Sequence, residues 1–284
     1  MIAMRSCNPK IEEIEKIAST DEDGKPMHLH SVSAVTQDSA DEQPDISLIV
    51  PVYNEQERIA KSLYQIKDYL ENSDLTYEVL VIDDGSNDLT TEIVKFVDIY
   101  GAEVKSQPQG RLKQNSINKG KGYSIANGML NSRGRIVVFT DADAATPITE
   151  LPKLLDKIEQ GFDVAIGTRK HALSKTSGRT PLRLFLSWGF NLVARLLGLV
   201  NVRDSQCGFK AYRRDTAIKV AEHQQTNRFC FDVEQLYISS RLGYKIGEVP
   251  VIWNHSEGSS LSLLRDSIRM FADLLRIRFV HRNL

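Results

Sequence analysis

Short apolar runs alternate with segments of helical periodicity along most of this chain. The first run, ISLIVPV at 46–52, is followed by apolar residues three or four positions apart at 59, 63, 66 and 70. The same pattern predicts further strands at 77–82, 102–106, 136–140 and 163–167, and helices at 88–100, 120–132 and 149–160. Strands that alternate with helices form a mostly parallel sheet with helices on both faces. The sequence therefore predicts an α/β fold.

The two ends of the chain differ from this central region. Residues 1–44 are rich in Ser, Asp, Glu and Gln and hold few aromatic residues, which is typical of a disordered or weakly ordered tail. Residues 45–258 are predicted to form one domain that includes a helix at 181–199. Residues 259–284 are predicted to form a basic amphipathic helix, because apolar residues at 261, 264, 268, 271 and 275 follow helical spacing and three arginines flank them.

Composition and charge exclude several classes of protein. The formal net charge is −1, so the chain lacks the positive charge typical of nucleic-acid binding. The cysteines at 7, 207 and 230 are odd in number and lack metal-site spacing, which favours a reducing compartment without disulfides. No apolar segment predicts a transmembrane helix, and the first residues lack the apolar core of a signal peptide.

Polar and acidic residues follow three predicted strands at the point where each strand ends. They are Asn54-Glu55, Asp83-Asp84 and Asp141-Ala142-Asp143. In a parallel sheet these strand ends share one edge, where open α/β sheets bind their ligands. Repelling carboxylates in one crevice cost stability unless a cation or a ligand is bound. We therefore interpret these residues as a binding site rather than as solubilising turns.

Asp141 and Asp143 are the strongest candidates for chemistry. They follow the apolar run at 136–140 directly. Mg²⁺ and Mn²⁺ prefer oxygen ligands, and Mg²⁺ is usually held by one or two carboxylates together with substrate phosphates. The pair is thus predicted to bind a divalent metal that bridges to a nucleotide diphosphate. An acidic turn that caps the next helix is the better explanation of the tripeptide alone, because D-x-D is common, so the metal site depends on the rest of the chain.

A glycine-rich basic loop, NKGKG at 118–122, precedes a predicted helix. Glycines let the backbone approach a ligand, a helix N-terminus favours anions, and Lys121 adds a positive charge. The loop matches neither G-x-x-x-x-G-K-[ST] nor G-x-G-x-x-G, which argues against a kinase, an ATPase or a dehydrogenase. A solvated loop at a helix start is the alternative.

The segment 182–200 is almost wholly apolar, apart from four polar residues that recur every four positions: Arg183, Ser187, Asn191 and Arg195. On a helix they form one polar stripe. Arginines are costly in hydrocarbon, so this segment suits a helix that lies at a bilayer surface better than one that crosses it. The polar stripe is expected to face the binding site. The alternative for this segment is a helix within the core. The alternative for the C-terminal segment 259–284 is a helix docked on the domain.

Four motifs, in this order, resemble the inverting glycosyltransferases of family 2 with the GT-A fold. They are PVYNE at 51–55, DDGS at 83–86, NKGKG at 118–122 and DAD at 141–143. The stretches GTR at 167–169 and DSQCGFK at 204–210 are similar to the polyprenyl-phosphate branch of that family. Within it, DADAAT at 141–146 and FDVE at 231–234 most resemble the dolichyl-phosphate glucosyltransferases. The resemblance covers about 46–280 and implies a GT-A, Rossmann-like sheet.

The resemblance also implies which residues meet the nucleotide sugar. The donor-binding residues would be Pro51, Tyr53, Glu55, Asp83, Asp84, Lys121, Asp141 and Ala142. Among them, Asp83 and Asp84 would hold the base or the ribose. Asp141 and Asp143 would hold the Mg²⁺ or Mn²⁺ ion on the diphosphate.

On the acceptor side the resemblance implies contacts with a lipid phosphate. These would come from Arg169, Arg183, Ser187 and Lys210. Gln206 is expected in a strand that faces the sugar. The candidate catalytic residues are Asp143, Arg169, Gln206 and Asp232. Asp232 and Glu234 are equally well explained as acids that the dipole of a helix N-terminus favours.

The chain departs from the family pattern at two places. Ala145 replaces a Gln that mannosyl relatives carry two residues after the DAD motif, which fits the glucosyl branch. Gly258-Ser259-Ser260 has Ser where many relatives have Lys. That removes one phosphate contact unless His255 or Arg265 supplies it.

The reaction implied is attack of a polyprenyl phosphate oxygen on the anomeric carbon of UDP-glucose, at the cytoplasmic face of a membrane. A phosphate with a second pKa of about 6 is already ionised near neutral pH, so this acceptor needs no general base. A single displacement would give a β-linked glucosyl lipid. Three alternatives stay open: GDP-mannose as the donor, transfer to a hydroxyl with Asp232 as the base, and a membrane protein that binds nucleotide sugars without turnover.

Overall fold

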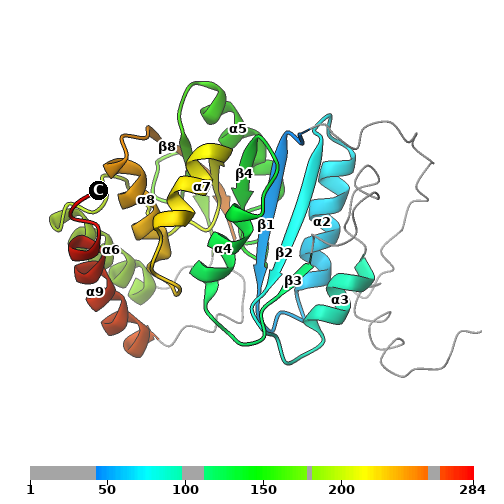
Figure 1. Ribbon diagram of the computed structural model, residues 1–284, viewed down its shortest axis with the longest axis horizontal. Helices are drawn as coiled ribbons and strands as arrows, with labels where there is room; N and C mark the ends of the chain where they lie inside the picture. Colours follow the sequence, from blue (N-terminus) through cyan, green and yellow to red (C-terminus); the bar gives the residue numbers. More distant parts are fainter. Residues whose placement is uncertain (1–42, 98–111, 178–180, 255–262) are drawn as a thin grey trace, which may run out of the picture.

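The computed structural model describes residues 43–97, 112–177, 181–254 and 263–284, and it leaves the side chains at 181–186 and 263–269 undescribed. Nearly all of the predicted tail and the strand predicted at 102–106 therefore lie outside the described residues. The described part is one central sheet with helices packed on both of its faces (Figure 1).

The central sheet has seven strands in the order β3-β2-β1-β4-β7-β5-β8. Their bounds are Ile46–Val52 for β1, Tyr77–Asp83 for β2, Leu112–Gln114 for β3, Ile136–Phe139 for β4, Val164–Thr168 for β5, Lys210–Arg213 for β7 and Ile246–Pro250 for β8. Neighbouring strands are parallel except for β7, which runs antiparallel to both β4 and β5. Two short strands, β6 (Lys175–Thr176) and β9 (Ile252–Trp253), pair separately. The predicted mostly parallel sheet is confirmed.

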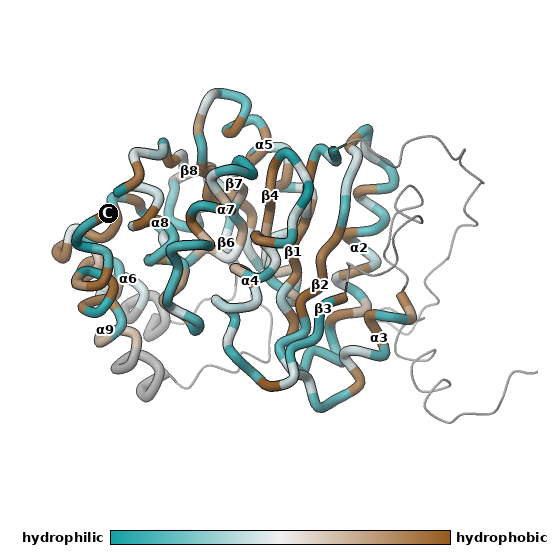
Figure 2. Tube along the Cα trace, in the orientation of Figure 1, coloured by the Kyte–Doolittle hydropathy of each residue, from teal (hydrophilic) through white to brown (hydrophobic). Residues whose placement is uncertain are grey.

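Helices bury both faces of this sheet. On one face lie α2 (Ile59–Glu71), α3 (Thr90–Val97) and α5 (Leu151–Glu159), the last preceded by a 3₁₀ turn at Ile148–Glu150. On the other face lie α4 (Lys121–Leu130), α7 (Arg214–His223) and α8 (Phe231–Arg241). Strands β1 and β4 are accordingly hydrophobic along most of their length (Figure 2), as expected for strands covered on both faces.

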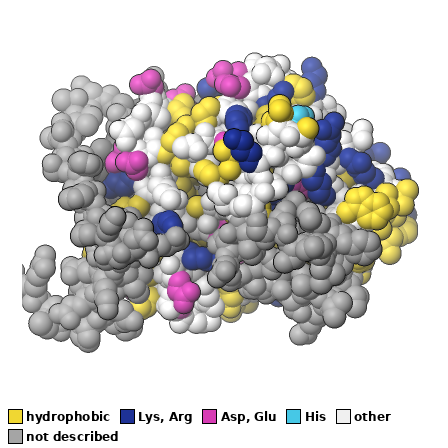
Figure 3. All heavy atoms as spheres, turned by 180° about the vertical axis from the view of Figure 1, so that it is seen from behind, with side chains coloured by type: hydrophobic (Ala, Val, Ile, Leu, Met, Phe, Trp, Pro, Cys, Tyr) yellow, Lys and Arg dark blue, Asp and Glu magenta, His cyan; other side chains and the backbone are white. Residues whose placement is uncertain are grey.

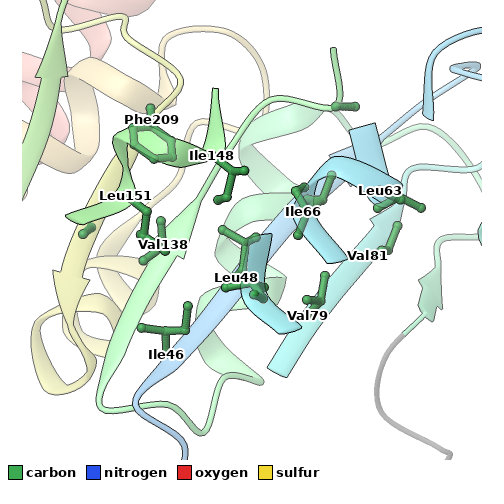
Figure 4. Close-up of a cluster of buried hydrophobic side chains, with 14 of the residues drawn as sticks. Ile46, Leu48, Leu63, Ile66, Val79, Val81, Val138, Ile148, Leu151 and Phe209 are labelled. Atoms are coloured by element: carbon green, nitrogen blue, oxygen red, sulfur yellow. The ribbon is translucent and has the colours of Figure 1, made fainter. Parts of the chain in front are cut away.

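The alternation of side chains along each strand explains why there are two cores. Leu48 and Val81 point to the α2 face, where they meet Ile66 (Figure 4), whereas Ile49 of the same strand belongs to the core under α4. Glycine permits the close approach of α4, because a Cβ on Gly128 would lie 2.6 Å from the side chain of Ile49.

Two further helices, α6 (Pro181–Leu196) and α9 (Leu263–Val280), lie at one end of the molecule beyond α8 (Figure 1). The rings of Phe190 on α6 and Phe271 on α9 have their centroids 6.1 Å apart. Leu274 and Ile277 bury the inner side of α9 against the second core. A helix is thus present in each of the two segments predicted to be amphipathic. No helix in the described ranges is both long and apolar enough to cross a bilayer.

Candidate active site

The ends of β1, β2 and β4 lie at one edge of the sheet, as the sequence predicted. Val52 pairs with Asp83, and Ile49 pairs with Phe139. The antiparallel strand β7 begins at this same edge, because its first residue, Lys210, pairs with both Phe139 and Ile166 of β5. The loops that follow β1, β2, β4 and β5, and the loop that precedes β7, therefore converge on one site.

Asp141 and Asp143 lie beside the start of α4. The ammonium of Lys121 donates to Oδ1 of Asp141, and the amide of Ala145 donates to Oδ1 of Asp143 at 3.1 Å. Burial raises the pKa of Asp143, and the neighbouring Asp141 carboxylate raises it further. Burial opposes the charge of Lys121, but the contact with Asp141 raises the pKa of that lysine overall. The two aspartates thus form a crowded acidic pair with one cation beside it.

The two carboxylates offer the oxygen ligands that a hard divalent ion prefers. A Cβ added to Gly208 would lie 2.1 Å from Oδ2 of Asp141, so the absence of a side chain at Gly208 keeps room for this carboxylate. Within the described ranges no three His, Cys, Asp or Glu side chains form a complete metal site. An ion held by Asp141 and Asp143 would therefore take its remaining oxygens from a substrate, as Mg²⁺ commonly does with phosphates.

Glu55 follows β1 at the same edge of the sheet. Arg58 holds its carboxylate, with Nε 2.9 Å and Nη2 2.6 Å from Oε2. Burial raises the pKa of Glu55, Arg58 lowers it, and the charge of Asp143 raises it again. Tyr53 is exposed, whereas Pro51 is buried within β1. Ala142, between the two aspartates, is also buried.

The carboxylates of Asp83 and Asp84 are buried and accept hydrogen bonds from protein groups. Asp84 accepts from the side-chain amide of Asn115 at 2.8 Å and from the backbone N–H groups of Lys119 and Gly120 at 2.9 and 2.7 Å. Asp83 accepts from the backbone N–H and the hydroxyl of Ser86 and from the hydroxyl of Thr91. Asp84 therefore fixes the loop that leads into Lys121, and its role toward a base or ribose stays a prediction.

Arg169 follows β5 and forms a bidentate ion pair with Asp204. Its Nε and Nη2 lie 2.7 and 2.8 Å from the two carboxylate oxygens, and its backbone N–H donates to Oδ2 at 3.0 Å. The guanidinium also lies 5.7 Å from the ring centroid of Trp253. Sequence analysis missed the partner Asp204, although it stands within the DSQCGFK stretch. The predicted phosphate-binding arginine is thus held in one orientation by a buried acid.

The predicted polar stripe of α6 faces the loop that carries Asp204. Arg195 Nη2 donates to the carbonyl of Val202 at 2.8 Å, and Asn191 accepts from the hydroxyl of Ser205 at 3.0 Å and donates to the carbonyl of Arg203. The neighbouring stripe of the helix, one position on, exposes Trp188, Leu192 and Leu196. In the described part of α6 the polar stripe therefore contacts the 202–205 loop, Phe190 and Ala194 pack into the second core, and a third, apolar stripe faces outward.

The loop after β5 also reaches α6 directly. Lys170 Nζ lies 3.4 Å from the backbone carbonyl oxygen of Ser187, the second member of the polar stripe. Arg183 lies on the same helix, but its side chain is outside the described part of the chain, as is that of Arg265 on α9. His255 and Gly258-Ser259-Ser260 also lie outside the described residues.

Lys210 and Asp232 form an ion pair beneath the site. Lys210 is fully buried; its ammonium donates to Asp232 and, at 2.8 Å, to the carbonyl of Cys207. Burial raises the pKa of Asp232, while the charges of Lys210 and Lys121 oppose that shift. One expectation is wrong: Gln206 lies in a turn that precedes β7 and not in a strand, because the chain must reverse there to enter the sheet antiparallel.

Comparison with known proteins agrees with this geometry. The sequence model of the family described as "Glycosyl transferase family 2" matches residues 47–220. A dolichyl-phosphate beta-glucosyltransferase of Trichomonas vaginalis is 37% identical over 245 residues, which cover 84% of this chain and 74% of the relative. That of Saccharomyces cerevisiae is 33% identical over 288 residues, which cover 96% of this chain and 85% of the relative.

Solved structures share the fold. Glucosyl-3-phosphoglycerate synthase from Mycobacterium tuberculosis, crystallised with Mn²⁺, UDP and glucosyl-3-phosphoglycerate, superposes with a TM-score of 0.61 at 19% identity, over 83% of this chain and 80% of that one. The same enzyme with Mg²⁺ and UDP gives a TM-score of 0.62 at 20% identity, over 83% and 79%. The chain belongs to glycosyltransferase family 2 and is a glycosyltransferase of the GT-A fold.

Proposed function

We propose that this enzyme transfers glucose from UDP-glucose to a polyprenyl phosphate of the dolichyl type, with inversion at the anomeric carbon. The names of its relatives in Trichomonas vaginalis and Saccharomyces cerevisiae support this acceptor and this sugar. The observation that carries the proposal is that β4, β5 and β7 bring Asp141, Asp143 and the Arg169 loop to one edge of the sheet, where this loop contacts α6.

The donor side supplies positioning and charge. Asp141 and Asp143 would hold the Mg²⁺ or Mn²⁺ ion, whose charge stabilises the departing diphosphate. Lys121 adds a second positive charge beside them. Glucosyl-3-phosphoglycerate synthase, which has the same fold, was crystallised with both metals and with UDP, which supports this arrangement.

The acceptor side needs cations more than it needs a base. A lipid phosphate is already an oxyanion near neutral pH, because its second pKa is about 6. Asp232, the candidate base, is paired with the buried ammonium of Lys210, which disfavours its use on a hydroxyl acceptor. Arg169, Arg183 and the hydroxyl of Ser187 are the groups we propose for the incoming phosphate.

The lipid would reach these groups along α6 and α9. The outward side of α6 exposes Trp188, Leu192 and Leu196, and that of α9 exposes Phe271, Leu275 and Phe279, in each case at a spacing of four residues. Figure 3 shows hydrophobic side chains gathered at this end of the molecule, with lysines and arginines nearby. Two apolar stripes with basic neighbours are typical of an interfacial membrane contact.

We propose that this contact is with the cytoplasmic face of a membrane. Cys207 and Cys230, the cysteines in the described part of the chain, are free thiols, which favours a reducing compartment. In this arrangement residues 45–258 form the catalytic domain, and the helix in 259–284 contributes to the membrane surface.

A donor panel tests the proposed function. The enzyme is incubated with short polyprenyl phosphate, Mn²⁺ and labelled UDP-glucose or GDP-mannose, and the label that enters a chloroform extract is counted. We expect label from UDP-glucose only, and none after chelation of the metal. Label from GDP-mannose alone would show that GDP-mannose, and not UDP-glucose, is the donor. Binding of a nucleotide sugar without any product would show that the protein does not catalyse transfer.

A further inference from the structure

The carboxylate of Glu234 lies buried between the C-terminal end of the chain and the loop 224–228. Its Oε1 accepts a hydrogen bond from the ring nitrogen Nε2 of His281, also buried, at 2.7 Å. Its Oε2 accepts from the backbone N–H of Thr226 at 2.7 Å, and the N–H of Gln225 lies 3.1 and 3.2 Å from the two oxygens. One side chain therefore joins the residue that follows α9 to this loop.

The same loop packs against the two glycines that flank Lys121. A Cβ added to Gly120 would lie 2.3 Å from the carbonyl oxygen of Asn227, and one added to Gly122 would lie 2.6 Å from that of Thr226. Such contacts leave no space for the backbone of α4 to move toward the loop. A shift of the loop would therefore shift the backbone on both sides of Lys121.

Hydrogen bonds also join the start of α4 to this loop. The N–H of Tyr123 donates to the carbonyl of Asn227 at 3.1 Å, and the side-chain amide of Gln224 donates to the carbonyl of Gly122 at 2.9 Å. The first turn of α4 is thus bonded to the loop that Glu234 holds. A continuous series of contacts runs from His281 through Glu234 and the loop to the lysine that contacts Asp141.

We propose that Glu234 and His281 are positioning residues. They couple the position of α9 to the position of Lys121 in the donor site. Loss of either partner leaves buried polar groups without their hydrogen bonds, which the loop relieves by moving. Because α9 carries the exposed stripe Phe271, Leu275 and Phe279, the helix that meets the lipid surface also sets how well the nucleotide is held. That the ligand is a nucleotide rests on the proposed function. The coupling between α9 and Lys121 does not, because it is argued from contacts within the protein.

A matched pair of variants separates this coupling from a general loosening of the C-terminus. Arg241 Nη2 donates to the carbonyl oxygen of Leu284 at 2.7 Å, so it also tethers the end of the chain, but it does not touch the loop. His281→Ala and Arg241→Ala therefore each remove one tether, and only the first removes the link to Glu234.

Hydrogen exchange of the full-length chain tests the link without any ligand. We expect the amides at 119–124 to exchange several-fold faster in His281→Ala than in Arg241→Ala or the wild type. His281→Gln retains an N–H donor and is expected to restore the slow exchange, which guards against a variant that simply fails to fold. Equal exchange at 119–124 in His281→Ala and Arg241→Ala overturns the proposal.

Calorimetric binding of UDP with Mn²⁺ tests the consequence. His281→Ala should weaken binding by about fivefold or more, the usual range for coupled sites, with Arg241→Ala and His281→Gln close to the wild type. Equal weakening by His281→Ala and Arg241→Ala contradicts the coupling. A wild type that binds no nucleoside diphosphate contradicts the proposed function instead, and the exchange experiment still decides the link.

Discussion

Gly208 lies against the carboxylate of Asp141 so closely that a Cβ at this glycine would be 2.1 Å from Oδ2 and 2.4 Å from Oδ1. The clash is with the end of a side chain, not with backbone, so the carboxylate can rotate away at small cost to folding. We therefore expect Gly208→Ala to keep its fold and to lose activity, by about 10²-fold for a displacement near 1 Å. Steady-state rates with a saturating acceptor, together with thermal unfolding, measure both quantities.

A matched control is Gly189→Ala, because a Cβ there meets nothing within 4 Å. It should leave both the rate and the melting temperature close to the wild type. A Gly208→Ala enzyme that turns over at the wild-type rate would mean that the position of Asp141 does not matter to catalysis.

The ionised carboxylate of Asp143 should support catalysis and lower the stability of the folded protein. Burial and the charge of Asp141 raise the pKa of Asp143 above its ordinary value, so its ionised form destabilises the folded state. The wild type gains stability as the pH falls through that raised pKa, and Asp143→Asn, which cannot ionise, should be the more stable protein at neutral pH. Below the ordinary pKa of an aspartate the two should be equally stable. Urea unfolding across this range measures the difference.

The same variant should lose its response to metal. We expect Asp143→Asn to lose activity by about 10²-fold or more, as when a charge-stabilising group is removed from a reaction centre. Mn²⁺ with UDP should raise the melting temperature of the wild type and leave that of the variant unchanged. An active Asp143→Asn enzyme that still depends on Mn²⁺ would show that other residues hold the ion.

The ion pair of Arg169 and Asp204 should dominate the stability of the acceptor side. Their side chains are only 13% and 1% exposed, so Asp204→Ala leaves a desolvated guanidinium without its partner. Such a loss costs about 3–5 kcal/mol, measured as the free energy of unfolding in urea. The exposed pair Lys219 and Glu222, at 57% and 45%, is the control, and Lys219→Ala should leave the free energy of unfolding close to that of the wild type. Equal costs would refute the structural role of Asp204.

Membrane association should depend on the outward leucines of α6 and α9. Leu196 and Leu275 are 78% and 51% exposed, so serine at both positions removes apolar contact without emptying the core. Each leucine buried in lipid is worth about 1.5–3 kcal/mol, so vesicle partitioning should fall about tenfold or more per substitution. Flotation with phosphatidylcholine and phosphatidylserine vesicles measures it. Leu130→Ser, at an exposed position on α4, should bind like the wild type.

That the ends of β1, β2 and β4 meet at one edge could be predicted from the sequence, because it depends only on which segments form strands and on their direction. β1 has the predicted bounds, and Asn54, Asp84 and Asp141 follow strands that run in the same direction. In a parallel sheet the strand direction decides which residues meet, and apolar runs are enough to recognise such strands. The meeting of the strand ends that carry Glu55, Asp84 and Asp143 at one edge could therefore be predicted from the sequence.

The partners of these residues could not be predicted, because they depend on packing between distant segments. Strand β7 has the sequence KAYR, which contains no apolar run, and its lysine is buried only because Asp232 of α8 meets it. The same holds for Asp204, whose partner Arg169 precedes it by 35 residues. Strand β3 is short and partly exposed, with only one apolar residue in its three, so hydrophobic pattern gave no sign of it.

The direction of β7 also bears on how enzymes of this fold can change their acceptor. β5 leaves the sheet and β7 returns to it at the same edge, since Ile166 and Lys210 are paired. The segment 169–209 consequently starts and finishes at the sheet edge where Asp141 and Asp143 lie. Replacing residues 170–203 with a segment of another length is expected to alter what is glycosylated, while Arg169, Asp204 and Gly208 stay in place near Asp141.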